Sequence, residues 1–171
     1  MFITLEGTEG CGKSTQAALL CEYLKKSRRR FFKTVEPGGT ELGQAIRKLL
    51  LEASYSISPE AETLLYMASR AHLVREVIQP KLKAGNIVVC DRWLDATVAY
   101  QGYGLGVDLK WIKAVAKEVT QGLEPDLTLF LDLPVRQGLE RARKRGKPDR
   151  IENRNLNFHK KVRTSGSDCS Y

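Results

Sequence analysis

The chain has 171 residues, of which 42% are hydrophobic and 28% are charged. This length and balance predict one domain with its own core and exclude a disordered polyelectrolyte. The apolar runs, such as Leu127–Leu133, are far shorter than the roughly 18 residues of a membrane helix, and Met1–Glu6 does not resemble a secretory signal. We therefore expect no membrane association. The four cysteines lack metal-binding spacing and favour a reducing, cytoplasmic setting.

The net charge of +8 is concentrated near the C-terminus. Segment Pro134–Arg163 contains 11 basic and 3 acidic residues, which accounts for the whole excess. A cluster of this kind can bind the phosphate groups of a small ligand or the backbone of a polynucleotide. Charge alone leaves both alternatives open.

Short apolar runs and segments of helical periodicity alternate along the chain. Strands are predicted at Phe2–Glu6, Phe31–Val35, Asn86–Cys90 and Leu127–Asp132. Helices are predicted at Lys13–Lys26, Glu41–Glu52, Asp108–Gln121 and Pro134–Lys144, with one more that begins at Ser58, is bent or interrupted at Pro80 and ends at Gly85. Strands separated by helices predict an α/β fold with a parallel sheet, helices on both faces, and ligands at the carboxyl ends of the strands.

The clearest motif is Gly7-Thr8-Glu9-Gly10-Cys11-Gly12-Lys13-Ser14, which fits G-x-x-x-x-G-K-[ST] between a predicted strand and a predicted helix. In such a loop, backbone N–H groups and the helix N-terminus bind phosphate oxygens. Lys13 is expected to reach the outer phosphates and Ser14 to bind Mg²⁺, with Thr15 beside them. We therefore predict that residues 7–15 bind ATP with Mg²⁺. The sequence contains no guanine-binding N-K-x-D motif and is short for a motor protein, so a small-molecule kinase is the expected class.

Further segments occur in the order and at the spacing of one known family. They are Thr34–Thr40, Tyr66–Ala71, Asp91–Trp93 and Ala99–Gly102. With the phosphate loop, they resemble the bacterial thymidylate kinases over about Met1 to Arg163. The resemblance implies a three-layer P-loop NTPase fold and transfer of the γ-phosphoryl group of ATP to dTMP, giving dTDP and ADP for dTTP synthesis. It also implies a homodimer through the helices near Ser58–Lys83 and Asp95–Gln101, and no nucleic-acid partner.

The resemblance assigns roles on the acceptor side of the site. Arg92 follows the third predicted strand and is expected to clamp the acceptor phosphate with two parallel hydrogen bonds; an ion pair with Asp91 is the alternative. Asp91 itself is expected to hold Mg²⁺ or its waters. Tyr66 is expected to stack on thymine and Arg70 to donate to its carbonyl oxygen; the alternative is a core tyrosine beside a solvated arginine.

The remaining acceptor contacts also come from the resemblance. Tyr100 is expected under the sugar, where a 2′-hydroxyl would collide, and Glu9 is expected to meet the 3′-hydroxyl. Thr97 is expected near the edge of the base. Further substrate contacts are expected at Glu36, Pro37 and Gln101.

The basic segment Glu140–Arg150 resembles the mobile lid that closes over ATP in this family. The phosphate loop has no arginine at its variable positions, so an arginine from the lid is expected to stabilise charge on the transferring phosphoryl group. Arg141 and Arg145 are the first candidates, and Arg143 and Arg150 are held in reserve. With Lys13 and Arg92, the first two complete the predicted catalytic set. A nucleic-acid patch or a solvated basic face is the alternative.

The sequence departs from the family at a few positions. Val35 stands where the family commonly has arginine, and Trp93 replaces the usual tyrosine or phenylalanine. Beyond the predicted domain at 1–163, where family members continue with the rest of a helix, a strand and a final helix, residues 164–171 are expected to form an irregular polar tail. We therefore expect a shortened C-terminus and a sheet without its last edge strand, which leaves the fourth strand exposed.

Three alternatives to an active dTMP kinase remain at this point. They are a nucleotide-binding chain with weak activity, a kinase of another nucleoside monophosphate, and a polyanion-binding protein that uses the basic segment. His72 and His159 are isolated in the sequence and have no expected function.

Overall fold

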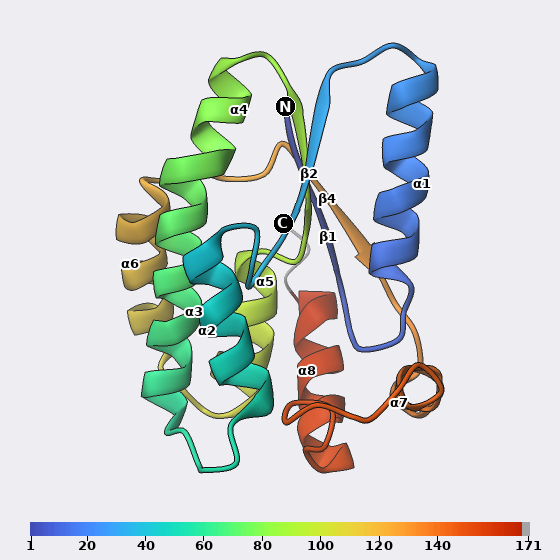
Figure 1. The fold of residues 1–171 in the computed structure, drawn as a ribbon. Coiled ribbons are helices and arrows are strands. Elements are labelled where there is room, and N and C mark those ends of the chain that lie inside the picture. Colours follow the sequence, from blue (N-terminus) through green and yellow to red (C-terminus); the bar gives the residue numbers. More distant parts are fainter. Residues whose placement is uncertain (169–171) are drawn as a thin grey trace.

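A four-stranded parallel sheet forms the centre of the fold (Figure 1). The computed structural model describes residues 1–168, with side chains described up to Ser165. The strand order is β2-β3-β1-β4, and the strands are β1 (Phe2–Gly7), β2 (Phe31–Val35), β3 (Ile87–Asp91) and β4 (Leu127–Leu131). The register sets Leu5 opposite Asp91 and Gly7 opposite Leu131, so the carboxyl ends of the strands meet at one edge. All four predicted strands are confirmed, within a residue at each end.

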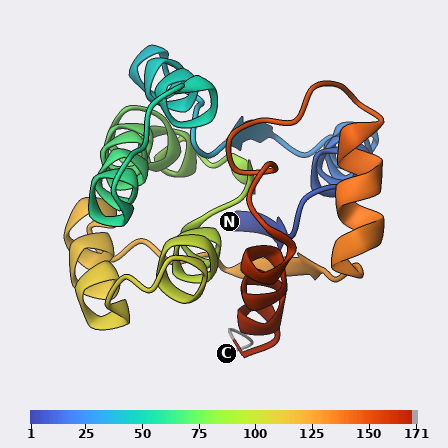
Figure 2. The same ribbon diagram turned by 90° about the horizontal axis from the view of Figure 1, so that it is seen from below.

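Helices cover both faces of the sheet, as the alternating pattern predicts. They are α1 (Lys13–Lys26), α2 (Glu41–Glu52), α3 (Pro59–Leu73), η1 (Val74–Ile78), α4 (Gln79–Lys83), α5 (Leu94–Thr97), η2 (Val98–Gly104), α6 (Leu109–Thr120), α7 (Val135–Arg143) and α8 (Leu156–Asp168). Helices α1 and α7 lie on one side of the sheet, and α3, α4 and α6 lie on the other (Figures 1 and 2). None of the helices within residues 1–168 is long and apolar enough to cross a membrane.

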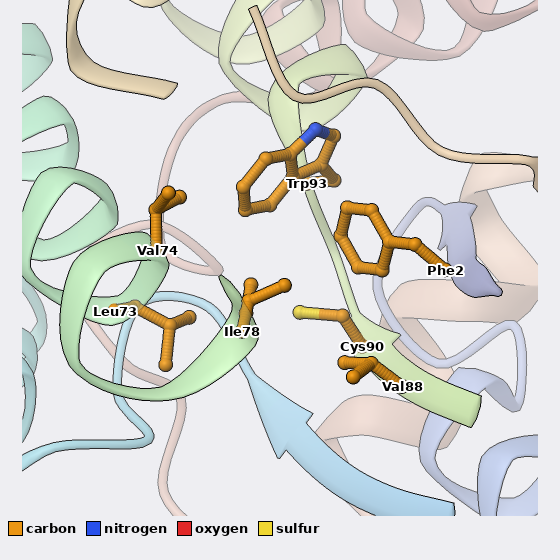
Figure 3. Packing of buried hydrophobic residues seen from close by; sticks show 7 residues of the cluster. All are labelled: Phe2, Leu73, Val74, Ile78, Val88, Cys90 and Trp93. Atoms are coloured by element: carbon orange, nitrogen blue, oxygen red, sulfur yellow. The ribbon is translucent and has the colours of Figure 1, made fainter. Parts of the chain in front are cut away.

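The core is divided by the sheet into two layers, because successive strand side chains point to opposite faces. Against α1, the layer contains Ile3, Leu5, Ala17, Cys21, Leu24, Ile87 and Val89. On the opposite face, residues from β1, β3, α3 and η1 pack around Trp93 (Figure 3). There the rings of Phe2 and Trp93 meet edge to face with centroids 5.0 Å apart. Trp93 is thereby fixed immediately after the end of β3, where the candidate site begins.

The start of α3 and the change of helix type that follows it both depend on local sequence. Ser58 Oγ accepts from the backbone N–H of Ala61 at the start of α3, as the Ser-Pro-Glu sequence predicts. Near the bend or interruption predicted at Pro80, the helix changes type, since the π-helical segment η1 lies between α3 and α4 and Pro80 itself lies in the first turn of α4. A proline has no N–H for the preceding turn, which accounts for the change of helix type.

Two parts of the chain differ from the sequence-based expectations. Residues 164–168 continue helix α8, so the expectation of an irregular tail is wrong there; residues 169–171 lie outside the described part. The hydroxyls of Thr164 and Ser165 donate to the carbonyls of Lys160 and Val162, which satisfies these polar side chains within the helix. Sequence periodicity also missed the helical segments α5 and η2, which carry many of the expected acceptor contacts.

Strand β4 is an edge strand with an open side, as expected. It pairs with β1, and Leu127, Leu129 and Phe130 are 42%, 37% and 42% exposed. The apolar composition of residues 127–131 therefore predicts the strand and its pairing with β1, but these side chains are more exposed than the composition suggests.

Candidate active site

The phosphate loop connects β1 to α1 and has the predicted strand–loop–helix context. Gly12 adopts a left-handed conformation (φ 101°) immediately before α1, which a side chain there would disfavour. The Lys13 Nζ is buried within the loop and donates to the carbonyls of Gly7 (2.9 Å) and Thr8 (2.7 Å). Burial, and then the charge of Arg92, lower the pKa of Lys13. The loop thus places a buried cation among backbone groups suited to phosphate.

An oxygen pair lies beside this loop at the end of β3. The Ser14 hydroxyl donates to Asp91 Oδ2 at 2.5 Å. Both residues line the same cavity, because β1 and β3 are neighbours in the sheet. A hydroxyl and a carboxylate are hard oxygen donors of the kind Mg²⁺ prefers.

Arg92 turns away from Asp91 and toward the phosphate loop. Its backbone is left-handed (φ 75°), an uncommon conformation for a residue other than glycine and one that clusters at functional sites. The guanidinium donates to Gly7 O and to the Tyr100 hydroxyl, each at 3.1 Å, and lies 3.6 Å from Glu9 Oε1. Burial alone would lower the pKa of Arg92, but Tyr100 and Glu9 outweigh it and raise that pKa, so the guanidinium stays charged.

Glu9 is the centre of a buried polar cluster. The Tyr100 hydroxyl donates to Glu9 Oε1 at 2.5 Å, and His159 Nδ1 lies 3.4 Å from Glu9 Oε2. Burial would raise the pKa of Glu9, but His159, Arg92 and Tyr100 together lower it to about 2. The carboxylate is therefore ionised and fixed in place at neutral pH.

His159 is a contact that the sequence did not reveal. It lies on α8, is 1% exposed, and reaches Glu9 from 150 residues along the chain. Neither ring nitrogen has a hydrogen bond with good geometry, so the contact with Glu9 is its main polar interaction among the described residues. An isolated histidine in an otherwise polar helix carries no pattern from which this partner could be predicted.

Arg70 of α3 lines the same cavity as the phosphate loop and is only 1% exposed. Its Nε lies 2.6 Å from Glu36 Oε1, and its NH2 group donates to Thr97 Oγ1 (2.8 Å) and to Trp93 O (3.2 Å). The alternative of a solvated arginine is therefore wrong. Tyr66 lies one helical turn earlier on α3 and lines the same cavity.

The phosphate loop and the residues around Arg70 line one cavity of about 450 Å³. The candidate residues that line it are Glu9, Gly10, Gly12, Lys13, Ser14, Thr15, Glu36, Pro37, Tyr66, Arg70, Asp91, Arg92, Thr97, Tyr100, Gln101 and Arg145. Gly7 and Thr8 contribute through the carbonyls that hold Lys13, and Cys11 Sγ lies 3.5 Å from Lys13 Nζ. The phosphate loop and the polar residues around Arg70 therefore line one cavity.

The family model for thymidylate kinase matches residues 5–168 of the chain. The chain belongs to the thymidylate kinase family. It is 48% identical over 171 residues to the thymidylate kinase of Deinococcus radiodurans. The matched region covers 100% of this chain and 83% of that protein. It is 54% identical over 162 residues to the thymidylate kinase of a Synechococcus species. This matched region covers 95% of this chain and 77% of that protein.

The fold comparison agrees with this family. The crystal structure of the thymidylate kinase from Ehrlichia chaffeensis superposes with a TM-score of 0.82 at 34% identity. The superposition covers 98% of this chain and 85% of that one. The predicted three-layer arrangement of a parallel sheet between helices is thus confirmed.

Within this thymidylate kinase fold, the expected lid separates into residues that reach the cavity and residues that do not. All three of Arg141, Arg143 and Arg145 are exposed, and of these only Arg145 lines the cavity. Arg150 is committed elsewhere, because its guanidinium donates to Leu50 O and to Glu62. Of the four arginines of the expected lid, Arg145 is therefore the one that lines the cavity.

Several cavity residues had no place among the sequence-based candidates. Val35 lines the cavity, and Arg47 of α2 donates to Pro37 O at 3.0 Å and lines it too. Asp149 and Glu152 line it from the segment after α7. Their Asp-x-x-Glu spacing is that of a capping pair, in which Asp149 Oδ1 accepts from the backbone N–H of Glu152 at 2.9 Å.

Proposed function

We propose that the chain transfers the γ-phosphoryl group of ATP to dTMP, giving dTDP and ADP. The observation that carries this proposal is the single cavity shared by the phosphate loop and the pocket around Arg70 and Arg92. A donor site and an acceptor site in one cavity suit direct phosphoryl transfer, in which positioning and charge stabilisation supply most of the rate. Family membership supports thymidine as the nucleoside.

On the donor side, we propose that the backbone of residues 7–15 and Lys13 bind the ATP phosphates. The left-handed glycine and the start of α1 support this, because they direct N–H groups and the positive end of the helix into the cavity. Arg145 is the lid residue that we propose for the transferring phosphoryl group, supported by its place in the lining. Arg141 is then a candidate only for a lid that closes further.

Mg²⁺ fits the oxygen pair at the end of β3. Ser14 Oγ and Asp91 Oδ2, 2.5 Å apart, are the groups that would hold the ion or its waters. When bound, Mg²⁺ neutralises charge on the phosphate oxygens. Asp91 also fixes the orientation of the Ser14 hydroxyl by accepting a hydrogen bond from it.

On the acceptor side, we propose that Arg92 clamps the phosphate of dTMP and that Glu9 meets the 3′-hydroxyl. The contacts among Arg92, Glu9 and Tyr100 support this, because they hold a cation, an acceptor and an aromatic ring within one cluster. Arg70 and Thr97 are proposed to bind the base and Tyr66 to stack on it, with Glu36, Pro37 and Gln101 completing the pocket.

The proposal is tested by ADP release from ATP and Mg²⁺ with dTMP, UMP, CMP or AMP as acceptor. We expect turnover of dTMP far ahead of the other three. Equal rates with AMP would refute the assignment of the acceptor. Binding of ATP and dTMP without turnover, seen as a raised melting temperature, would favour the nucleotide-binding alternative instead.

We also propose a homodimer and a cytoplasmic location. The dimer is expected through α3–α4 and α5–η2, and the 49% exposed Leu64 on α3 supports it. Within the described residues, Cys11, Cys21 and Cys90 are free thiols, which supports a reducing compartment. Light scattering should give twice the chain mass of 19.2 kDa, and a single-chain mass at micromolar concentration would contradict the dimer.

A further inference from the structure

Glu62 is a fully buried carboxylate that receives three hydrogen bonds from two distant parts of the chain. It lies in the first turn of α3 and is 0% exposed. Its Oε1 accepts from Gln101 Nε2 at 2.8 Å. Its Oε2 accepts from Arg150 at 2.6 Å and from Arg154 at 2.7 Å. A buried charge with this many partners is strongly tied to their positions, because leaving any of them unpaired is unfavourable.

Two of these partners belong to the segment that follows the lid helix α7. Arg150 is also fixed to the end of α2, where its Nε donates to Leu50 O (2.7 Å) and its backbone N–H to Leu51 O (3.1 Å). Next to it, Ile151 is 5% exposed and packs in a cluster with Tyr100 and Phe158. Because residues 149, 151 and 152 line the cavity, Glu62 holds one wall of the site against α2 and η2.

The third partner lies inside the site. An ionised carboxylate can only accept hydrogen bonds, so the amide of Gln101 must turn its Nε2 toward Glu62. This leaves Oε1 as the atom that Gln101 can present to the cavity it lines. An amide oxygen accepts from a base that carries a ring N–H, as thymine and uracil do, and has nothing to accept from the ring nitrogen of cytosine.

We propose that Glu62 is a positioning residue that orients the Gln101 amide for a base with a ring N–H and, through Arg150 and Arg154, holds segment 149–154 closed over the same pocket. One carboxylate thereby couples base recognition to the closed position of the lid's C-terminal end. The inference deepens the proposed function and rests on it for the identity of the base. The other part of the proposal, that Glu62 holds segment 149–154 in place through Arg150 and Arg154, does not depend on that identity.

The experiment compares the full chain with Glu62→Gln, which preserves size and removes the charge. The rate of trypsin cleavage within Arg141–Arg145, measured without nucleotides, shows how firmly Glu62 holds the neighbouring segment 149–154 in place. Steady-state kinetics report the pocket, through KM and kcat for dTMP and the inhibition constant of dCMP. We expect cleavage at least fivefold faster, KM for dTMP raised about tenfold with kcat changed less than threefold, and tighter inhibition by dCMP. A tenfold change is the scale of one hydrogen bond to a charged group.

Glu60→Gln is the matched control, because Glu60 is an exposed acid on the same turn of α3. It should leave all these quantities unchanged. If Glu62→Gln fails to fold, Arg154→Lys takes its place, since Arg154 is partly exposed and lysine keeps the charge but not the reach. It should shift cleavage and KM in the same direction by a smaller factor.

The outcomes separate the two proposals. Wild-type cleavage rates and wild-type KM in Glu62→Gln, or in Arg154→Lys where that variant is needed, would overturn the role of Glu62. A lowered melting temperature without a selective change in KM or cleavage would also overturn it, since that result means a purely structural role. If the unmodified chain turns over no dTMP, the proposed function fails, and the cleavage rates still decide whether Glu62 tethers the segment.

Discussion

Removing one hydroxyl tests whether the Glu9 cluster prepares the acceptor site. In Tyr100→Phe, the ring and its contact with the Arg92 guanidinium (4.9 Å) are retained, while two hydrogen bonds are lost. These are the 2.5 Å bond to Glu9 and the 3.1 Å bond from Arg92. A hydrogen bond to a charged group contributes about 1.5–3 kcal/mol, and two that share one hydroxyl are not additive. We therefore expect a total loss of about 2–3 kcal/mol.

This loss should fall on catalysis, because Glu9 and Arg92 are the residues proposed to hold the sugar and the phosphate of dTMP. It corresponds to a decrease of roughly 30- to 150-fold in kcat/KM for dTMP. Tyr103→Phe is the matched control, since Tyr103 lies on the same segment η2 and is 41% exposed. The assay is ADP release at varied dTMP. A kcat/KM for Tyr100→Phe within threefold of the Tyr103→Phe value would refute the reasoning.

Three further predictions concern the loop and the end of β1. A Cβ on Gly138 of α7 would lie 2.3 Å from Glu9 O, so Gly138→Ala should lower stability by about 1–3 kcal/mol and weaken ATP binding; an unchanged melting temperature and ATP affinity would contradict this. Cys11 is partly exposed beside Lys13, so ATP should slow its alkylation more than tenfold, measured by peptide mass spectrometry; equal rates with and without ATP would be inconsistent with a loop that binds phosphate. Burial raises the pKa of Glu6 from 4.5 to about 7, so its contribution to stability is fully present below pH 4.5 and is lost as the pH rises through 7. Glu6→Gln, which can still accept from the Trp93 N–H, should therefore stabilise the fold by about 3 kcal/mol at pH 8 but less than 1 kcal/mol at pH 5 in urea titrations, and an equal gain at both values would refute the assignment.

Local patterns predict much of this molecule because they depend on neighbours in the chain. The glycine spacing, the basic residue and the flanking apolar run of residues 2–15 all act within one strand–loop–helix unit, and the structure has that unit at the predicted place. The start of α3 follows in the same way from Ser58 and the proline after it. The resemblance to a family added the expected acceptor residues, all of which line one cavity.

Contacts between distant residues could not be predicted from one sequence. Glu62 meets Arg150 and Arg154 across 88 and 92 positions, and a glutamate in the first turn of a helix carries no local sign of such partners. The same holds for His159 and Glu9, which the fold brings together from α8 and the phosphate loop. The prediction of an irregular tail is wrong for residues 164–168, because polar residues that look unsuited to a helix extend α8, whose Phe158 and Val162 pack in the core.

The central claim is that the γ-phosphoryl group moves from ATP to dTMP within this cavity. Its most direct test uses ATP labelled in the γ-phosphate, with Mg²⁺ and dTMP, and separates the products by chromatography. The label should appear in dTDP in an amount equal to the ADP formed, and Arg92→Lys should reduce that transfer sharply because lysine cannot form two parallel hydrogen bonds. Label found only in inorganic phosphate, or retained entirely in ATP, would contradict the account.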